Sequence, residues 1–322
     1  MIKRLLTAAV AAAITLTCSS AIAEYPDKPV RIVFPNKAGS GYHKIILALV
    51  EELKSNIPHT IAVQAMPGAG TSAGTRFVQE QADDGYTLLF IHEAAFQTSA
   101  FGMLGFDILE EFQPLVRTNS NIPSLVTRGD APFSNIAELR KYAESNPVKA
   151  AINTGALSHL EFIGLSDTLG IDLRLVHVGG GGAGFKQAVL AGDVDLIHTN
   201  AGSVRGLVDA GQLKMLSYYG GGKRHVMFPD IPTLEEQGFD TPGTVGNNGY
   251  LWIRRSAPQE AKDYWINILE AVLTNPESES KLEEILGVDM GYLSGDDLEK
   301  LARELYDQRA GYIKEFGISV NK

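Results

Sequence analysis

The sequence has little cysteine, no long run of basic residues and no long hydrophobic segment. A single cysteine in 322 residues excludes an intrachain disulfide and a cysteine-based zinc site. Lys and Arg total 28 against 38 Asp and Glu, a formal charge of −10. A chain this acidic is unsuited to wrapping a phosphate backbone, so we expect no nucleic-acid partner.

The composition is otherwise that of an ordinary globular protein. Hydrophobic residues make up 44% of the chain and charged residues 20%, which supplies enough apolar side chains for a sizeable core. At this length two domains are the usual arrangement. The N-terminal apolar run, residues 5–17, is shorter than the ~20 residues that a helix needs to span a bilayer.

The N-terminus has the pattern of a secretory signal peptide. Lys3 and Arg4 precede the apolar run, and Ala21-Ile22-Ala23 supplies the small-x-small pattern of a cleavage site. We therefore expect residues 1–23 to be removed by cleavage after Ala23. The mature chain is then exported and contains no cysteine, so an oxidising compartment does not affect it.

Cys18 lies within this segment and raises the alternative of a lipoprotein anchor. A lipobox places a Leu three residues before its cysteine and a small residue directly before it. Thr15 and Thr17 occupy those positions here. The sequence therefore favours export without an anchor.

Beyond the signal peptide, strands alternate with helices. The expected strands are Val30–Phe34, Ile61–Gln64, Thr87–Ile91, Ser124–Thr127, Ala150–Asn153, Leu173–Val178, Val194–His198, Leu213–Tyr218 and Tyr250–Ile253. The expected helices are Ile45–Leu53, Arg76–Gln81, Asn135–Ser145, His159–Leu169, Phe185–Ala191, Val204–Ala210, Glu260–Leu273, Glu277–Leu286 and Asp296–Phe316. Two such series, separated near residue 120, predict two doubly wound α/β lobes with parallel strands and right-handed crossovers.

Ligands bind such sheets beyond the carboxyl ends of the strands, where loops lead into helices. Four of these loops are rich in Gly and small polar residues: 38–43, 67–72, 153–159 and 179–184. Glycine allows close backbone approach, and the free N–H groups at a helix start attract an anion. The alternative is that each loop is only a tight turn. Together, the four loops favour a cleft that binds a carboxylate through backbone donors.

No motif predicts catalysis, a cofactor or a metal. Gly179-x-Gly181-x-x-Gly184 has the spacing of a dinucleotide fingerprint, but no acidic residue follows about 20 residues later to hold a ribose. Gly-x-Ser-x-Gly and His-Glu-x-x-His motifs are absent from the sequence. Each histidine at a strand–helix junction is more often structural than a ligand; these are His43, His92, His159 and His198. We expect no enzyme, although an exported enzyme remains the third alternative.

Eight short segments, in order along nearly the whole mature chain, resemble one family. They are 25–33 (YPDKPVRIV), 67–70 (PGAG), 84–89 (DGYTLL), 158–160 (SHL), 176–178 (VHV), 192–196 (GDVDL), 210–213 (AGQL) and 229–233 (PDIPT). The chain is similar in these segments to the extracytoplasmic solute receptors of tripartite tricarboxylate transporters, the Bug receptors. Each segment is a weak signal, and eight in order are a strong one.

The resemblance implies a Venus-flytrap fold, in which two α/β lobes joined by a hinge hold a ligand in the cleft between them. It implies a periplasmic protein that delivers a small carboxylate to the two membrane subunits of a tripartite permease. Some relatives instead look like co-receptors that report ligand status to a signalling kinase, which is the second alternative. We expect a monomer.

The first glycine-rich loop departs from the family pattern. His43 stands where the family commonly has an Asp, which is associated with recognition of the ammonium group of amino acids. Because the chain lacks this Asp, no carboxylate at this position pairs with the ammonium group of an amino acid, and the sequence gives no reason to expect selection of amino acids. His43, with Lys37 or His92, would suit a second carboxylate instead. Glu93, if it faces the cleft, would suit a hydroxyl or amine donor.

The resulting expectation assigns residues 24–122 plus 247–322 to lobe 1 and residues 123–246 to lobe 2. Backbone N–H groups of the first two glycine-rich loops hold one carboxylate from lobe 1, and residues of lobe 2 complete the site. The expected ligand-binding residues are Ser40, Gly41, Tyr42, His43, Ala69, Gly70, Thr71, His92, Thr154, Ser158, Gly180 and Asn200. Di- and tricarboxylates are the expected ligands.

Overall fold

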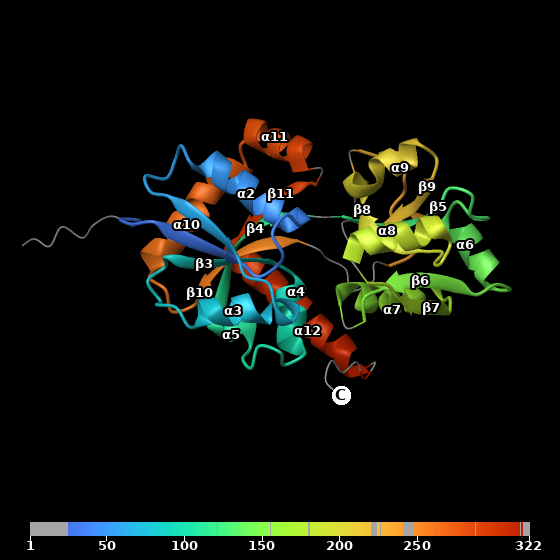
Figure 1. Cartoon of the computed structure of the whole chain (residues 1–322), viewed down its shortest axis with the longest axis horizontal. Helices are drawn as coiled ribbons and strands as arrows, with labels where there is room; N and C mark the ends of the chain where they lie inside the picture. The colour runs from blue at the N-terminus through green and yellow to red at the C-terminus, as the bar shows by residue number, and fades with distance from the viewer. Residues whose placement is uncertain are drawn as a thin grey trace, which may run out of the picture.

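The computed structural model describes residues 25–317, except 121, 155, 180, 220–223, 226, 241–247, 287 and 316. Its elements gather into two α/β lobes (Figure 1), and the expected fold class is confirmed. The expected signal peptide, residues 1–23, lies outside the described residues. No helix in the described part of the chain is long and apolar enough to cross a bilayer.

The first lobe is built on a six-stranded sheet with the order β11-β4-β10-β3-β1-β2. Its strands are β1 (Val30–Phe34), β2 (Ile61–Ala65), β3 (Thr87–His92), β4 (Phe112–Asn119), β10 (Gly249–Arg254) and β11 (Met290–Ser294). Its helices are α2 (Gly41–Leu53), η2 (Ala69–Thr71), α3 (Ser72–Gln79), α4 (Ala94–Ala100), α5 (Ile108–Glu111), α10 (Gln259–Leu273), α11 (Pro276–Leu286) and α12 (Gly295–Glu315).

Helices cover both faces of this sheet, so its central strands are apolar on both sides. In β3, Leu88 and Phe90 pack into one cluster with Trp265 of α10. The alternate residues of β3 point to the opposite face, where Leu89 packs in a second cluster with Trp252. This two-sided burial explains why β3 is a continuous apolar run in the sequence.

The second lobe contains a three-stranded sheet, β8-β5-β9, and a parallel pair, β6-β7. An isolated bridge between Ala150 and Leu196 links the two. The strands are β5 (Pro123–Arg128), β6 (Val148–Ile152), β7 (Leu173–His177), β8 (Ile197–Asn200) and β9 (Leu213–Tyr218). The helices are α6 (Ile136–Ala143), α7 (Leu157–Leu169), α8 (Gly181–Ala191), η3 (Ala201–Val204), α9 (Arg205–Asp209) and η4 (Glu235–Gln237).

The sheets are mixed, whereas the sequence led us to expect parallel strands joined by right-handed crossovers. The β1–β2, β1–β3 and β6–β7 pairs are parallel, whereas β10 is antiparallel to β3 and β4, and β5 is antiparallel to β8 and β9. The strands β5 and β10 are the first that the chain enters after it passes from one sheet to the other. They therefore reach their sheets without the helical crossover that makes neighbouring strands parallel.

The chain passes between the sheets twice, once between β4 and β5 and once between β9 and β10. The lobe boundaries expected from the sequence, 24–122 plus 247–322 and 123–246, remain a proposal. The lobes also touch beside these passages. His225 Nε2 lies 3.8 Å from Asp289 Oδ2, and both side chains are buried. The helix α12 reaches from the first lobe to α7 of the second (Figure 1).

Candidate functional site

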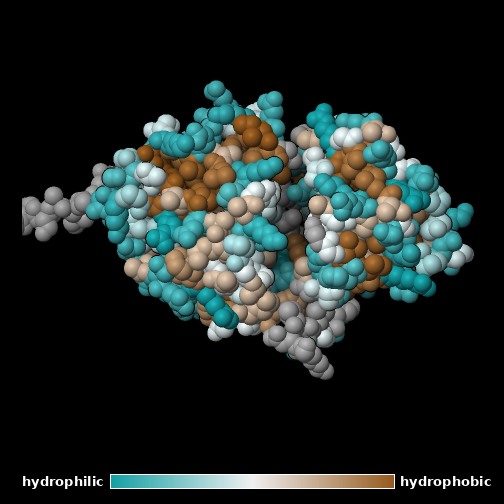
Figure 2. Space-filling view, viewed as in Figure 1, coloured by the Kyte–Doolittle hydropathy of each residue, from teal (hydrophilic) through white to brown (hydrophobic). Residues whose placement is uncertain are grey.

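A pocket of about 890 Å³ lies between the two lobes, in the hollow visible in Figure 2. Helix starts surround it: the starts of α2, α4, α7 and α8 all contribute lining residues. The free backbone N–H groups of a helix start carry partial positive charge. The fold therefore directs positive ends of helices from both lobes towards one space.

The loop between β1 and α2 forms one wall of the pocket. Ser40 is the N-cap residue of α2, and its side chain makes no capping hydrogen bond. Its Oγ is buried and has no hydrogen-bond partner among the described residues. Tyr42 follows in the first turn, and its ring lies 4.6 Å from that of His92, centroid to centroid. The Ser40 hydroxyl is thus available to a ligand in the pocket.

The segment Ala69–Thr71 is held in an unusual backbone conformation beside this wall. Ala69, Gly70 and Thr71 all have positive φ angles, of 43°, 62° and 86°. A β-branched residue rarely adopts such a φ, so the strain at Thr71 must be held by its surroundings. The Thr98 hydroxyl lies 2.9 Å from Gly70 O, 2.7 Å from Ala94 O and 3.2 Å from Thr71 Oγ1. Strain of this kind is common at ligand-binding loops.

His92 ends β3 on the same side of the pocket. Its Nδ1 accepts a hydrogen bond from the Ala94 N–H at 3.2 Å, and its Nε2 lies 3.3 Å from Asn36 Nδ2. Desolvation of the ring, with a smaller effect of the Arg309 charge, lowers the pKa of His92 to about 4. His92 is therefore a neutral polar group near pH 7, and its role towards a second carboxylate stays a prediction.

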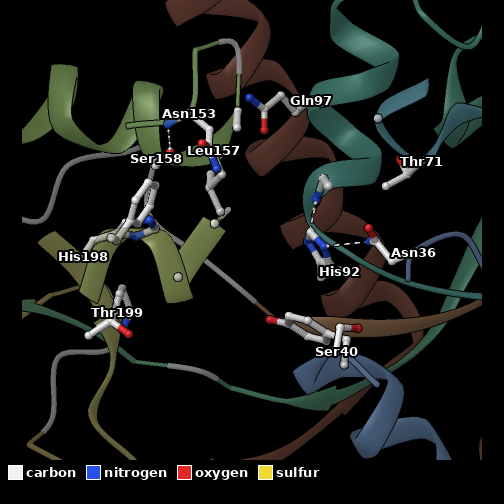
Figure 3. A pocket seen from close by; sticks show the side chains of 18 of the residues that line it. Asn36, Ser40, Thr71, His92, Gln97, Asn153, Leu157, Ser158, His198 and Thr199 are labelled. Atoms are coloured by element: carbon white, nitrogen blue, oxygen red, sulfur yellow. Dashed lines mark hydrogen bonds between the residues drawn. The ribbon is translucent and has the colours of Figure 1, made fainter. Parts of the chain in front are cut away.

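The second lobe contributes the start of α7. Ser158 is buried, and its Oγ accepts a hydrogen bond from the Asn153 N–H at 2.9 Å. No hydrogen bond among the described residues takes up the hydroxyl proton of Ser158, so it can be donated to a ligand. The Thr154 N–H donates to His177 Nδ1 at 3.1 Å, which fixes the loop between β6 and α7. Figure 3 shows Asn153 and Ser158 on the opposite side of the pocket from Asn36 and His92.

The remaining wall comes from α8 and β8. Gly181 and Gly182 begin α8, and a Cβ built on either would meet no atom within 4 Å. Gly184 is different, because its Cβ would lie 1.9 Å from Gly179 O. The sequence left open whether this glycine run widens the cleft or loosens its rim. The structure shows that Gly182 faces open space and that Gly184 allows a close backbone approach.

The pocket lining is electrostatically one-sided. Among the described residues that line it there is no Asp and no Glu, although the chain has 38 acidic residues. The lining does include Lys186, whose Nζ donates to Ser203 O at 3.1 Å. A carboxylate placed here meets helix starts, hydroxyls, amides and a cation without a facing anion.

Eight of the residues expected from the sequence line this pocket; they are Ser40, Tyr42, Gly70, Thr71, His92, Thr154, Ser158 and Asn200. Gly41 and Ala69 neighbour the lining but are not part of it. Gly180 lies outside the described residues.

His43 is also absent from the lining. Its Nδ1 accepts a hydrogen bond from the Gly39 N–H at 3.2 Å, and its ring lies 5.5 Å from that of Phe34. Lys37 is exposed and does not line the pocket either. Glu93 turns away from the pocket and is fully buried. The structure thus gives none of these three side chains a place on the pocket wall.

Sequence reasoning missed several lining residues, which are Asn36, Gln97, Thr98, Asn153, Lys186, His198, Thr199 and Ser203. Most lie one to four residues from an expected position. For His198 there was a signal, since it lies at a strand–helix junction. The described residues contain no group of three His, Cys, Asp or Glu side chains that could hold a metal ion.

Comparison with known proteins identifies the family. Residues 45–318 match the family TctC, described as the tripartite tricarboxylate transporter family receptor. The chain is 27% identical over 238 residues to a UPF0065 protein in the gbd 5' region of Cupriavidus necator, covering 72% of each chain.

Three solved structures have the same fold. BugD, a periplasmic binding protein, is 27% identical with a TM-score of 0.72, over 92% of this chain and 99% of BugD. Rpa4515 of R. palustris, solved with adipate, is 20% identical with a TM-score of 0.77, over 92% and 99%. MatC (Rpa3494) of Rhodopseudomonas palustris, with bound malate, is 22% identical with a TM-score of 0.70, over 90% and 100%.

The family that the sequence segments resemble is confirmed by these matches, and so is the periplasmic binding protein fold. Over most of its length the chain matches a family of receptors that bind solutes, not a family of enzymes. The chain belongs to the TctC family of tripartite tricarboxylate transporter receptors, which are periplasmic solute-binding proteins.

Proposed function

We propose that this protein captures a small carboxylate, a di- or tricarboxylate, between its lobes and delivers it to the membrane subunits of a tripartite tricarboxylate transporter. The observation that carries the proposal is the charge of the pocket. Its described lining has no carboxylate side chain, and helix starts from both lobes border it. The ammonium group of an amino acid would find no counter-charge there, whereas a carboxylate would find several donors.

Capture proceeds by closure of the lobes. The first lobe contributes Ser40, Gly70 and Thr71, and the second contributes Ser158 and Asn200. A ligand that contacts both sets only when the lobes approach has a higher affinity for the closed state, so it shifts the equilibrium towards closure. The two chain passages between the sheets are the proposed hinges. Closure changes the surface that the two lobes present together, and a permease can recognise that surface.

Two of the structural neighbours support this substrate class. Rpa4515 was solved with adipate and MatC with malate, and both ligands are dicarboxylates. The cleft of 890 Å³ is much larger than either ligand, which fits an open state that narrows on closure.

A thermal-shift screen of the mature chain, residues 24–322, tests the proposal. The panel contains α,ω-dicarboxylates, malate, citrate, monocarboxylates, amino acids and sugars. A ligand at 100 times its Kd adds about 2.7 kcal/mol to the free energy of unfolding, which is readily detected. We expect shifts confined to di- and tricarboxylates. A shift with amino acids or sugars alone would overturn the proposed ligand class.

A further inference from the structure

His198 and Glu161 form a buried contact at the edge of the pocket. His198 lies in β8 and lines the pocket, and its side chain is 15% exposed. Its Nδ1 contacts Glu161 Oε2 of α7, a carboxylate with 0% exposure. The imidazole also packs between Phe162 and Phe185, with centroid distances of 6.0 and 5.7 Å. The ring is therefore fixed in position.

The contact places a carboxyl group against one nitrogen of the ring. A carboxylate oxygen accepts hydrogen bonds, so a proton on Nδ1 of His198 is favoured beside it. Among the described residues Glu161 has no other cationic partner, and neither of its carboxyl oxygens has a hydrogen-bond partner. A buried carboxylate needs a paired charge, and His198 is the described side chain placed to supply it. The other ring nitrogen, Nε2, is left to meet a ligand.

His92, across the pocket, has no carboxylate against its ring nitrogens among the described residues. Its Nδ1 accepts a hydrogen bond from a backbone N–H, so that nitrogen carries no proton and the ring is neutral. Figure 3 shows the two histidines on opposite sides of the pocket, His198 beside Ser158 and Thr199, and His92 beside Asn36. Of these two imidazoles, only His198 has a carboxylate partner. The second lobe thus offers an imidazole with a carboxyl group behind it, and the first lobe offers a neutral imidazole.

The surroundings of His198 favour an anion as its partner. Lys186 lines the same side of the pocket, and Gly181 and Gly182 at the start of the eleven-residue helix α8 border it. Asn200 and Ser203 add neutral polar groups. No described residue on this wall contributes a carboxylate to the pocket surface. Glu161 is fully buried and does not line the pocket, so a ligand meets the imidazole first.

We propose that His198, held as an imidazolium by Glu161, binds the second acidic group of the ligand and thereby selects dicarboxylates over matched monocarboxylates. This inference rests on the proposed function, because the helix starts and the Ser40 loop must hold the first carboxylate. Glu161 is a positioning residue, because it acts on the ligand only through His198. The pair therefore sets ligand specificity, and binding of the first carboxylate does not depend on it.

The test compares each diacid with its own monomethyl ester. A series of α,ω-diacids with three to eight carbons is first titrated into the mature chain by calorimetry. The diacid that binds most tightly is then compared with its ester. The ester keeps the chain length and the first carboxylate but removes the second charge. We expect the wild type to prefer the diacid by about 10- to 100-fold, the range for a hydrogen bond to a charged group.

The variants His198→Gln and Glu161→Gln should each lower this preference to less than about threefold. The affinity for the diacid should fall, and the Kd of the ester should stay within about twofold of the wild-type value. Glu93→Gln is the matched control, since it neutralises another fully buried glutamate that does not line the pocket. It should leave the preference unchanged even if it lowers Tm.

The outcomes separate the two proposals. If the wild type binds diacid and ester equally, the role of His198 is overturned while carboxylate capture stands. The role of His198 is also overturned if His198→Gln lowers the affinity for the diacid and the ester to the same extent. The residue is then structural or contacts the first carboxylate. If neither the diacids nor the esters bind to the wild type, the proposed function and this inference both fail.

Discussion

Arg309 of α12 and Glu93, the residue between β3 and α4, form an ion pair in which both side chains are fully buried. The residues are 216 positions apart in the chain. Tyr250 Oη and Asn248 Nδ2 each donate to Glu93 Oε1 at 2.9 Å. This network joins α12, β10 and β3 directly behind the pocket wall that carries His92. It also fixes Asn248, which lies directly before β10, where the chain re-enters the first lobe.

Arg309→Met should be strongly destabilising, because it leaves the Glu93 carboxylate buried without a counter-charge. We expect a loss of about 3–5 kcal/mol in the free energy of unfolding, measured by urea denaturation. The double variant Glu93→Gln/Arg309→Met removes both charges and should recover part of this loss. If the double variant is as unstable as the single variant, the ion pair is not the source of the effect.

The lowered pKa of His92 predicts an acid-dependent loss of stability. The ordinary value of 6.5 falls to about 4 in the folded protein, so the unfolded chain takes up the proton first. The contribution of His92 to stability is complete above pH 6.5 and is lost as the pH falls towards 4. NMR titration of the His92 Cε1 resonance should give a midpoint near 4. A midpoint near 6.5 would contradict the buried, neutral ring.

Gly184 and Gly182 should respond differently to the same substitution. A Cβ on Gly184 would lie 1.9 Å from Gly179 O, whereas a Cβ on Gly182 meets nothing within 4 Å. Gly184→Ala should therefore displace the start of α8, lowering both Tm and ligand affinity. Gly182→Ala should leave Tm nearly unchanged. Equal Tm values for the two variants would show that the close approach at Gly184 is not required.

Thr98→Val should weaken binding more than it weakens the fold. The substitution keeps the shape of the side chain but removes the hydroxyl that lies near Gly70 O and Ala94 O. We expect a stability loss of about 1 kcal/mol together with a larger loss of ligand affinity, because the strained Ala69–Thr71 segment is released.

Thr274→Val is the matched control for Thr98→Val. It removes the equivalent hydrogen bond, from Thr274 Oγ1 to Glu270 O at 2.8 Å, at the exposed residue that follows α10. Affinity measured by calorimetry should not change in this variant. If both variants bind the ligand like the wild type, the Ala69–Thr71 segment does not hold the ligand.

Much of the fold can be predicted from the sequence, because most strands are short apolar runs bounded by turn residues. The strand β4 (Phe112–Asn119) was missed, since Pro114 and Arg117 interrupt its apolar pattern. Pro114 is tolerated there because β10 has a register shift between Leu251 and Trp252, directly opposite it. The edge strand β11 was missed because its residues are mostly only half-buried and carry little apolar pattern.

The residues of the candidate site were predictable where the backbone conformation places them at the pocket. They were less predictable where their place depends on the direction of the side chain. Glycine-rich loops before helices indicated Ser40, Gly70 and Ser158. His43 was expected at the pocket from its position in a family motif, but the first turn of α2 directs it towards Gly39. The contact behind the proposed role of His198 was hidden, because Glu161 is distant in sequence and only the fold brings the two side chains together.

The central claim is that a carboxylate binds between the lobes. Calorimetric titration of Gly182→Trp with the diacid that gives the largest thermal shift tests it most directly. The indole would fill the open space in front of Gly182. Gly206→Trp, on the exposed helix α9 where a Cβ also meets nothing, is the control. The account predicts one-to-one binding in the wild type and the control, and none in Gly182→Trp at unchanged Tm. Wild-type affinity in Gly182→Trp would contradict it.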